Sequence, residues 1–204
     1  AYEIAQGLVG SEMCIRDSAE AAGRKAAVMV ISEGELGQIV SARCGRPHDL
    51  LGMHKCRGGI VVRAYVVDAK SCRLVDLRNP SAEPAEMQKL DRSGFFELFI
   101  KGARKPFPYR FKVERYGGRI DEFADPYSFP PTLSGDELYL FGKGDDRKVY
   151  EHLGSRIAEV GGVRGVAFAV WAPTARRVSV VGDFCEWDGR YFPMRPLGSS
   201  GVWE

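Results

Sequence analysis

The clearest β pattern in the sequence is GIVVRAY, from Gly59 to Tyr65, and a related stretch, GVAFAVW, runs from Gly165 to Trp171 at an offset of 106 residues. Both stretches are rich in β-branched and aromatic residues, which are typical of strands. At the same offset, residues 68–75 align with residues 174–181, so each copy predicts a strand, a short turn and a second strand. These matches predict that one small β unit occurs twice in the chain.

Two further pairs of short segments support the repeat. Residues 94–97 (GFFE) align with residues 201–204 (GVWE) at an offset of 107, and Leu51-Gly52 aligns with Leu153-Gly154 at an offset of 102. In the first copy, further strands are predicted beyond this point, as far as Phe123. Measured against the first copy, the second copy lacks about 25–30 residues of its last strands.

Short strands separated by turn residues favour an antiparallel sandwich. We therefore expect an all-β fold of two tandem immunoglobulin-like β-sandwiches, the second truncated. The expected division is a non-native or disordered leader at residues 1–30, a β-sandwich module at 31–126, a linker at 127–150 and an incomplete second β-sandwich module at 151–204. A short helix is expected at about residues 33–41.

Composition excludes several classes of protein. The 29 basic and 27 acidic residues leave a formal charge of +2, without the basic stripe of a nucleic-acid binder. No apolar run approaches the length of a membrane span. The five cysteines are scattered and form no C-x-x-C pair, which argues against a metal site or a disulfide framework; they are Cys14, Cys44, Cys56, Cys72 and Cys185. We expect a cytoplasmic protein that needs no cofactor and binds neither nucleic acid nor membrane.

The segment between the two copies carries the most specific motifs. It contains DPYSFPP at residues 125–131 and YEHLG at residues 150–154, followed by FAVWAP at residues 168–173 and VVGDF-x-x-WDGR at residues 180–190. These motifs resemble the N-terminal region of bacterial glycogen (1,4-α-glucan) branching enzymes, over about residues 45–204. There, an extra N-terminal module precedes a starch-binding module of the isoamylase N-terminal type.

The resemblance implies a function for the parent protein. Such an enzyme transfers α-1,4-glucan segments to form α-1,6 branches in glycogen biosynthesis, is monomeric, and carries its catalytic barrel after these modules. This chain is then expected to bind and position α-glucan, to pack against that barrel and to be inactive alone. Two alternatives stay open: a glucan-binding regulatory or scaffold protein, and the N-terminal module of a debranching or trehalose-releasing hydrolase.

The resemblance also implies the candidate glucan-binding residues, which are Glu186, Trp187 and Asp188. An aromatic ring can serve as a flat platform for a sugar face, so Trp187 is either such a platform or a core residue. The family usually has Asn-Asn where this chain has Cys185-Glu186, which removes two amide groups. Trp171, in an apolar strand, is expected to pack in the core. No catalytic residue is expected, because the carboxylates fall in turns and linkers without a barrel to place a reactive pair.

Overall fold

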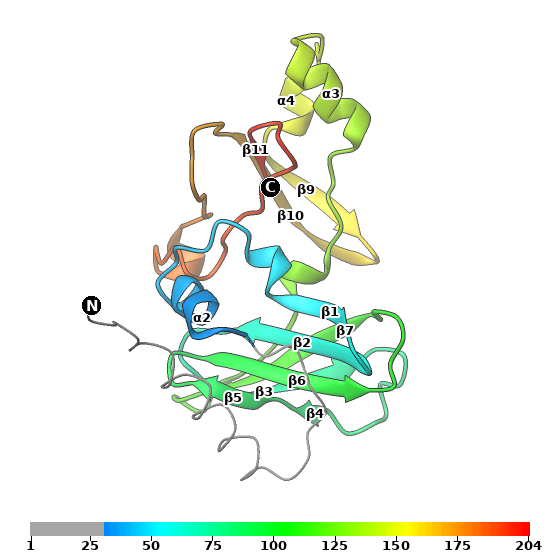
Figure 1. Cartoon of the computed structure of the whole chain (residues 1–204), viewed down its shortest axis with the longest axis vertical. Helices are drawn as coiled ribbons and strands as arrows, with labels where there is room; N and C mark the ends of the chain where they lie inside the picture. The colour runs from blue at the N-terminus through cyan, green and yellow to red at the C-terminus, as the bar shows by residue number, and fades with distance from the viewer. Residues whose placement is uncertain (1–30) are drawn as a thin grey trace, which may run out of the picture.

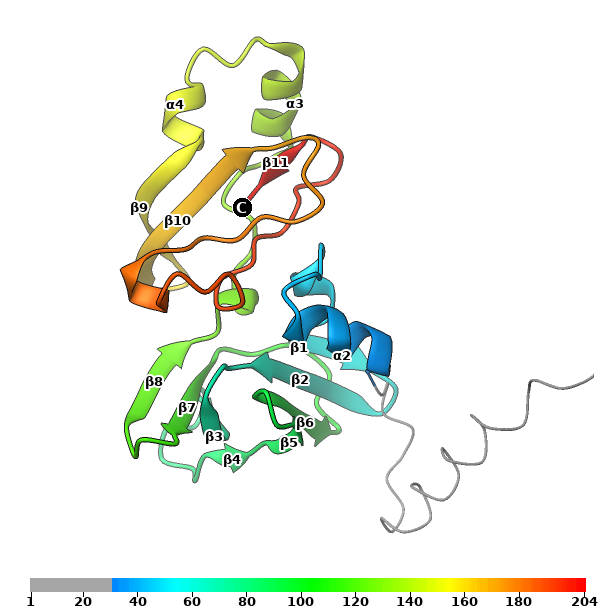
Figure 2. The same ribbon diagram turned by 90° about the vertical axis from the view of Figure 1, so that its left-hand side faces the viewer.

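The computed structural model describes residues 31–204 and consists mainly of antiparallel strands in two tiers along its longest axis (Figure 1). Strands β1 to β8 form the lower tier, and β9 to β11 form the upper tier (Figures 1 and 2). The prediction of an all-β fold is confirmed. The leader predicted at residues 1–30 lies outside the described residues, as does Cys14. Within residues 31–204, every helix is too short or too polar to cross a bilayer.

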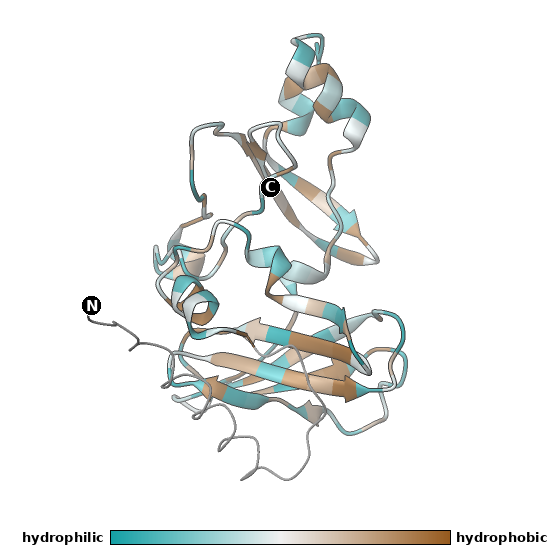
Figure 3. Cartoon of the chain, viewed as in Figure 1, coloured by the Kyte–Doolittle hydropathy of each residue, from teal (hydrophilic) through white to brown (hydrophobic). Residues whose placement is uncertain are grey.

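Two four-stranded sheets face each other in the lower tier. The first sheet has the strand order β1-β2-β6-β5, with the bounds Gly52–Cys56, Gly59–Tyr65, Phe95–Lys101 and Gln88–Asp91. The second has the order β4-β3-β7-β8, with the bounds Ala85–Glu86, Ala69–Asp76, Tyr109–Arg115 and Ile120–Ala124. Hydrophobic residues concentrate on β2 and β6 (Figure 3).

The inner faces of these two sheets build one hydrophobic core. Strand β2 contributes Ile60, Val62 and Ala64, whose exposed fractions are 0%, 0% and 2%. Phe111 and Val113 of β7 pack in the same core from the opposite sheet. Full burial of such a side chain contributes about 1.5–3 kcal/mol, so this contact between the sheets stabilises the sandwich.

Helix α2 (Glu33–Val40) covers the outer face of the first sheet (Figure 2). It begins with a capping box, in which Glu35 N donates to Ser32 Oγ (3.3 Å) and Ser32 N donates to the Glu35 carboxylate (2.9 Å). Ile39 of the helix packs in a second cluster with Phe95 of the sheet. The helix expected at residues 33–41 is confirmed. The 3₁₀ helix η1 follows it at Pro47–Asp49.

The upper tier is a three-stranded sheet with the order β11-β10-β9. Strands β9 and β10 form a hairpin, and β11 is short; their bounds are Gly154–Val160, Val163–Trp171 and Val202–Trp203. Helices α3 (Gly135–Lys143) and α4 (Val149–His152) project beyond this sheet (Figure 1). The chain passes from the lower tier to the upper through η2 (Pro126–Ser128).

The first two strands of each tier pair in the same register. Gly52 of β1 lies opposite Arg63 of β2, and Gly154 of β9 lies opposite Ala169 of β10. These are the partners that the offsets of 102 and 106 residues predict.

The third strand of each tier keeps the register as well. Tyr65 of β2 lies opposite Phe95 of β6, and Trp171 of β10 lies opposite Val202 of β11, as the offsets of 106 and 107 predict. The repeat of these three strands is therefore confirmed by strand pairing, which is independent of residue similarity. The second strand predicted in the later copy, within residues 174–181, is not formed: only Ser179 makes an isolated bridge, to Pro193, because residues 133–204 hold no counterpart of β7, the strand that pairs with β3 in the first copy.

The equivalence also includes a pair of hydrogen bonds outside these strands. Met87 N donates to the Cys72 carbonyl (3.0 Å), and Met194 N donates to the Val178 carbonyl (2.8 Å). Both methionines are buried, so the segment that contains each methionine follows an equivalent path within its own tier.

The repeat extends further upstream than sequence comparison detected. Helix α3 begins with the same capping box as α2, made by Ser134 and Glu137 at an offset of 102 from Ser32 and Glu35. Its apolar residues pack on the upper sheet as those of α2 pack on the lower one; the matched pairs are Leu36 with Leu138, Ile39 with Phe141, and Ile31 with Leu133. We call residues 31–124 the first repeat and residues 133–204 the second repeat.

The two repeats differ in what covers the inner face of the sheet. Among residues 133–204, no strand corresponds to β7 or β8. Val166 is 55% exposed, whereas its equivalent Ile60 is fully buried. On the other face of the sheet, on the side of α3, the prediction that Trp171 packs in the core is also wrong, because the residue is 56% exposed although its ring meets that of Phe141 edge-on at 6.0 Å.

The two tiers contact each other directly. The Arg177 guanidinium donates to the Ala42 carbonyl, and Arg195 holds the connecting segment by donating to the Phe129 carbonyl (2.8 Å). A Cβ on Gly45 would lie 2.7 Å from the Arg176 carbonyl oxygen, so this approach of two backbones requires glycine.

Candidate functional site

The three predicted glucan-binding residues lie on one surface loop of the second repeat, between residues 182 and 192. The loop begins with the 3₁₀ helix η3 (Asp183–Cys185). Cys185 is 2% exposed, and its sulfur lies 3.4 Å from the Gly182 carbonyl oxygen. This buried thiol fixes the base of the loop, because it fills space beneath the turn as a small apolar group.

Trp187 is a surface residue, which excludes the alternative that it packs in the core. Its side chain is 67% exposed. Its indole Nε1 donates to Asp183 Oδ1 at 2.9 Å. One polar edge of the ring is thus satisfied within the loop, while most of the apolar surface remains open to a ligand.

The backbone at this point is strained. Glu186 and Trp187 have φ angles of 54° and 60°, in the left-handed region that L-residues with a side chain disfavour. Each such residue costs about 1–2 kcal/mol. Residues with such backbone strain persist only where surrounding interactions hold them in place, and they are concentrated at functional sites.

Asp188 has a different position from the two residues before it. Its carboxylate accepts from the Arg190 guanidinium at 2.6 Å and 2.8 Å, and Oδ1 also accepts from Arg190 N at 2.9 Å. These hydrogen bonds from Arg190 hold the pKa of Asp188 below its usual value. The structure therefore brings Glu186 and Trp187 to the surface together, whereas Asp188 orders the turn through Arg190.

Aromatic neighbours enlarge this surface beyond the residues selected from the sequence. Phe184 is 64% exposed, and its ring centroid lies 5.7 Å from that of Phe192, which is 38% exposed. Tyr191 follows at 6.3 Å from Phe192. Phe184 lies in the Gly-Asp-Phe motif, so the sequence could have indicated it as a candidate binding residue. Sequence alone, however, does not distinguish a buried phenylalanine from an exposed one.

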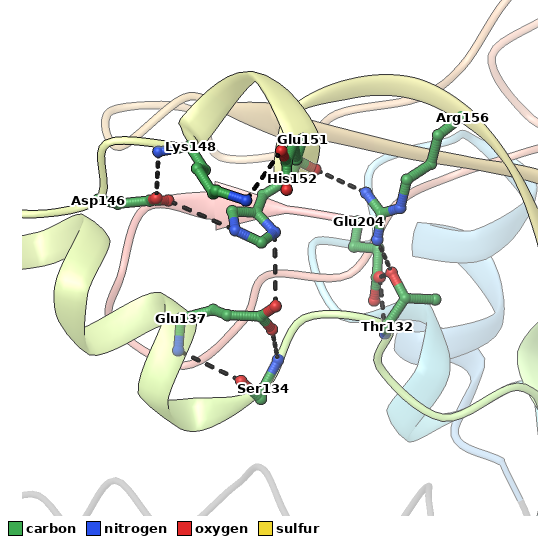
Figure 4. Close-up of polar contacts among 9 residues, drawn as sticks. All are labelled: Thr132, Ser134, Glu137, Asp146, Lys148, Glu151, His152, Arg156 and Glu204. Carbon is green, nitrogen blue, oxygen red and sulfur yellow. Dashed lines mark hydrogen bonds and ion pairs between the residues drawn. The ribbon is translucent and has the colours of Figure 1, made fainter.

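A second polar cluster joins α3, α4 and β9 (Figure 4). His152 lies between two carboxylates, 3.5 Å from Glu137 and 3.8 Å from Asp146. Glu137 also accepts from Ser134 N at 2.6 Å, and the hydrogen bonds from Ser134 lower its pKa. Since Glu137 closes the capping box of α3, this cluster holds the two helices together.

Next to it, Glu204 connects the last strand to the start of the second repeat (Figure 4). Its carboxylate accepts from Thr132 N at 2.8 Å and from Arg195 at 3.0 Å. Arg156 donates to the Thr132 hydroxyl and to the His152 carbonyl. These contacts cross the sheet and account for the low exposure of the Glu204 side chain, 7%.

One carboxylate is fully buried at the end of the first repeat. Asp125 is 0% exposed, accepts from the Tyr109 hydroxyl and from Tyr127 N (2.9 Å), and caps η2. Burial raises the pKa of Asp125 to about 6, against the opposing effect of these two hydrogen bonds. Burial also lowers the pKa of nearby His48 to about 4, and the Arg195 charge acts in the same direction.

Two family models match the chain. The model described as alpha-1,4-glucan branching enzyme GlgB, N-terminal domain, matches residues 32–127. The model described as carbohydrate-binding module 48 (isoamylase N-terminal domain) matches residues 152–204, which include the whole loop of Trp187.

Curated relatives align across both domains. The chain is 46% identical to the 1,4-alpha-glucan branching enzyme GlgB of Rubrobacter xylanophilus over 84% of its residues, 41% to that of Myxococcus xanthus over 89%, and 45% to that of Pseudomonas syringae pv. tomato over 83%. It spans 22–24% of the length of these relatives. The structure of an apo pullulanase from Paenibacillus barengoltzii is 15% identical to this chain, and the aligned region covers 60% of this chain and 21% of the pullulanase chain. The TM-score of this superposition is 0.33, which is too low to support a conclusion.

Proposed function

We propose that the chain is the N-terminal, non-catalytic, glucan-positioning part of a 1,4-alpha-glucan branching enzyme. The parent protein would be a hexosyltransferase that transfers α-1,4-glucan segments to form α-1,6 branches. Its catalytic barrel would be the partner of this region within the same polypeptide.

One observation carries the proposal: a single alignment of 172–181 residues runs through both domains at 41–46% identity. The carbohydrate-binding domain alone would leave a regulatory subunit or a debranching hydrolase equally open, because such domains occur in many glucan-active proteins. The domain at residues 32–127 favours a branching enzyme, because its family model is described by that activity.

The loop around Trp187 is the proposed contact with α-glucan. The exposed indole offers a platform on which the C–H groups of a sugar face can pack. The Glu186 carboxylate, also exposed, can accept hydrogen bonds from sugar hydroxyls. Asp188 would contribute by ordering the turn through Arg190 (2.6 Å) as well as by any contact of its own.

The role of such a contact is positional. A weak sugar site joined to a catalytic domain raises the local concentration of a polymeric substrate without any chemistry of its own. Glycosyl transfer needs two carboxylates across one glycosidic bond. Residues 31–204 form antiparallel sheets and short helices and no barrel of alternating strands and helices that could place such a pair, so we expect no branch formation by this chain.

Co-sedimentation of the purified chain with glycogen tests the binding. Trp187→Ala should weaken binding several-fold, since an aromatic contact is worth about 0.5–1.5 kcal/mol. Tyr150→Ala is the matched control, because Tyr150 is 73% exposed and lies outside the loop. Equal binding by both variants would exclude Trp187 as the platform.

Incubation of the same chain with amylose tests the second half of the proposal. The expected result is no new α-1,6 linkage. Branch formation by the purified chain would contradict a purely positional role.

A further inference from the structure

The first repeat contains a groove that lies away from the loop of Trp187. It lies beside strand β3 of one sheet and β5 of the other, at the point where the chain passes from β4 to β5 between the sheets. Its volume is about 340 Å³, at the lower end of the range for clefts that hold small ligands. Met87 and Phe96, both nearly fully buried, contribute apolar lining.

Charges of both signs surround the groove. Lys70 and Lys89 contribute two positive charges, and Glu86 contributes one negative charge. Arg73, the cross-strand neighbour of Glu86, adds a further positive charge, and Glu114 a further negative one. Lys70 is already paired with Glu114 at 2.7 Å, and Lys89 donates to the Ala69 carbonyl and the Tyr116 hydroxyl, so both lining ammonium groups have oxygen partners before any ligand binds and the groove suits a neutral ligand.

Polar groups of both kinds line the groove. Ser71 and Gln88 can each donate and accept, and Glu86 accepts. The Lys89 ammonium donates to the Ala69 carbonyl (2.6 Å) and to the Tyr116 hydroxyl (3.0 Å), which leaves one of its three protons for a ligand. A neutral ligand with many hydroxyl groups satisfies such a mixture.

An exposed aromatic ring flanks the groove. Tyr116 is 68% exposed, and the Lys89 ammonium lies 5.0 Å from its ring centroid. This cation–π contact and the hydrogen bond to the hydroxyl hold the ring beside the groove. A fixed ring next to mixed donors and acceptors is the combination that a sugar ring requires.

We propose that this groove is a second α-glucan site, which holds one or two sugar rings of a chain whose other part contacts Trp187 or a neighbouring branch. The proposal rests on the function proposed above. Two weak sites on one polypeptide increase the avidity for a branched polymer when both can be engaged together.

A titration of the ¹⁵N-labelled chain with maltoheptaose, followed by NMR, distinguishes the two sites. The backbone amides of Ser71, Gln88 and Lys89 report on the groove, and the indole N–H of Trp187 reports on the loop. We expect both sets of signals to shift. Shifts at Trp187 alone would overturn the second site and leave the proposed function intact. The absence of both would overturn both, and shifts at the groove alone would support the groove and exclude the loop. Inorganic phosphate should leave the groove signals unchanged, and phosphate shifts without sugar shifts would contradict the neutral-ligand argument.

Variants then test the contacts of the groove. Tyr116→Ala should raise the maltoheptaose Kd at the groove about three- to tenfold and leave the Trp187 signal unaffected. Tyr116→Phe keeps the ring and should retain most of the affinity. Tyr150→Ala, which removes an equally exposed tyrosine elsewhere, should change neither Kd. An unchanged groove Kd in Tyr116→Ala would refute the proposal.

Discussion

Replacement of Asp125 by Asn should change how the stability of this protein depends on pH. Asp125 is fully buried at the end of the first repeat, and burial raises its pKa to about 6 from the ordinary 3.8. A carboxyl group with a raised pKa binds its proton more tightly in the folded state than in the unfolded state. Its contribution to stability is therefore complete below pH 4 and is lost as the pH rises through 6.

The size of the effect follows from the shift. Each pKa unit corresponds to about 1.4 kcal/mol, so a shift from 3.8 to about 6 amounts to on the order of 3 kcal/mol. Asn cannot ionise, but its amide can still bond the Tyr109 hydroxyl and its oxygen can still accept from Tyr127 N. Asp125→Asn should thus lose little stability at pH 4 and gain on the wild type, by roughly 3 kcal/mol, between pH 4 and pH 7.

Urea unfolding of both proteins at several pH values between 4 and 8 measures this difference. Subtraction of one curve from the other removes the contributions of other groups, including His48, whose lowered pKa acts in the opposite direction. Asp145→Asn, a change at an exposed carboxylate, serves as the control and should leave the profile unchanged. A constant difference between Asp125→Asn and the wild type across this range would refute the reasoning.

Four further substitutions have defined expectations. Glu186→Gly should stabilise the chain by about 1 kcal/mol in thermal or urea unfolding, because glycine relieves the left-handed strain at φ 54°; a loss of stability would show that the Glu186 side chain makes an essential contact. Ser134→Ala and Ser32→Ala should each lower the free energy of unfolding by about 1 kcal/mol, because each removes one of the two equivalent capping boxes. Amide hydrogen exchange should become faster in α3 for Ser134→Ala and in α2 for Ser32→Ala. If exchange in either helix is unchanged by its own substitution, the two capping boxes are not equivalent. Arg63→Ala should cost about 3–5 kcal/mol in urea unfolding, because Arg63 is 2% exposed and pairs with Glu97 at 2.8 Å; a cost below 1 kcal/mol would show that solvent or other groups compensate Glu97.

Local sequence pattern was sufficient to predict the first repeat's main strands and the residue equivalence between the two copies, but not the loss of the second strand at residues 174–181. Strand propensity is a property of short segments, and the offsets of 102, 106 and 107 residues come from comparing such segments. An error of one residue in the alignment of two strands would place every apolar side chain on the wrong face, so the matching positions are well determined. For that reason Gly59–Tyr65 and Gly165–Trp171 could be matched residue by residue from the sequence alone.

Which of these side chains are exposed depends on the packing of the layers. Val166 is as apolar as its equivalent Ile60, but burial depends on what the opposite layer supplies, and only the first repeat has strands β7 and β8 among the described residues. Trp171 lies on the other face of its sheet, where it contacts Phe141 of α3 and stays 56% exposed, whereas Tyr65 packs in the cluster beneath α2. The equivalence of α2 and α3 was also missed, because a capping box and a few apolar residues are too common to be recognised without their packing partners.

The same distinction applies to the two candidate sites. The motif around Trp187 is contiguous in sequence, so the loop could be selected, although the turn of Asp188 toward Arg190 could not. The groove of the first repeat joins Lys70 of β3 to Lys89 of β5, which are brought together only when the two sheets of the sandwich pack. Sites built within one turn are visible in a sequence, whereas sites built between sheets arise from non-local pairing.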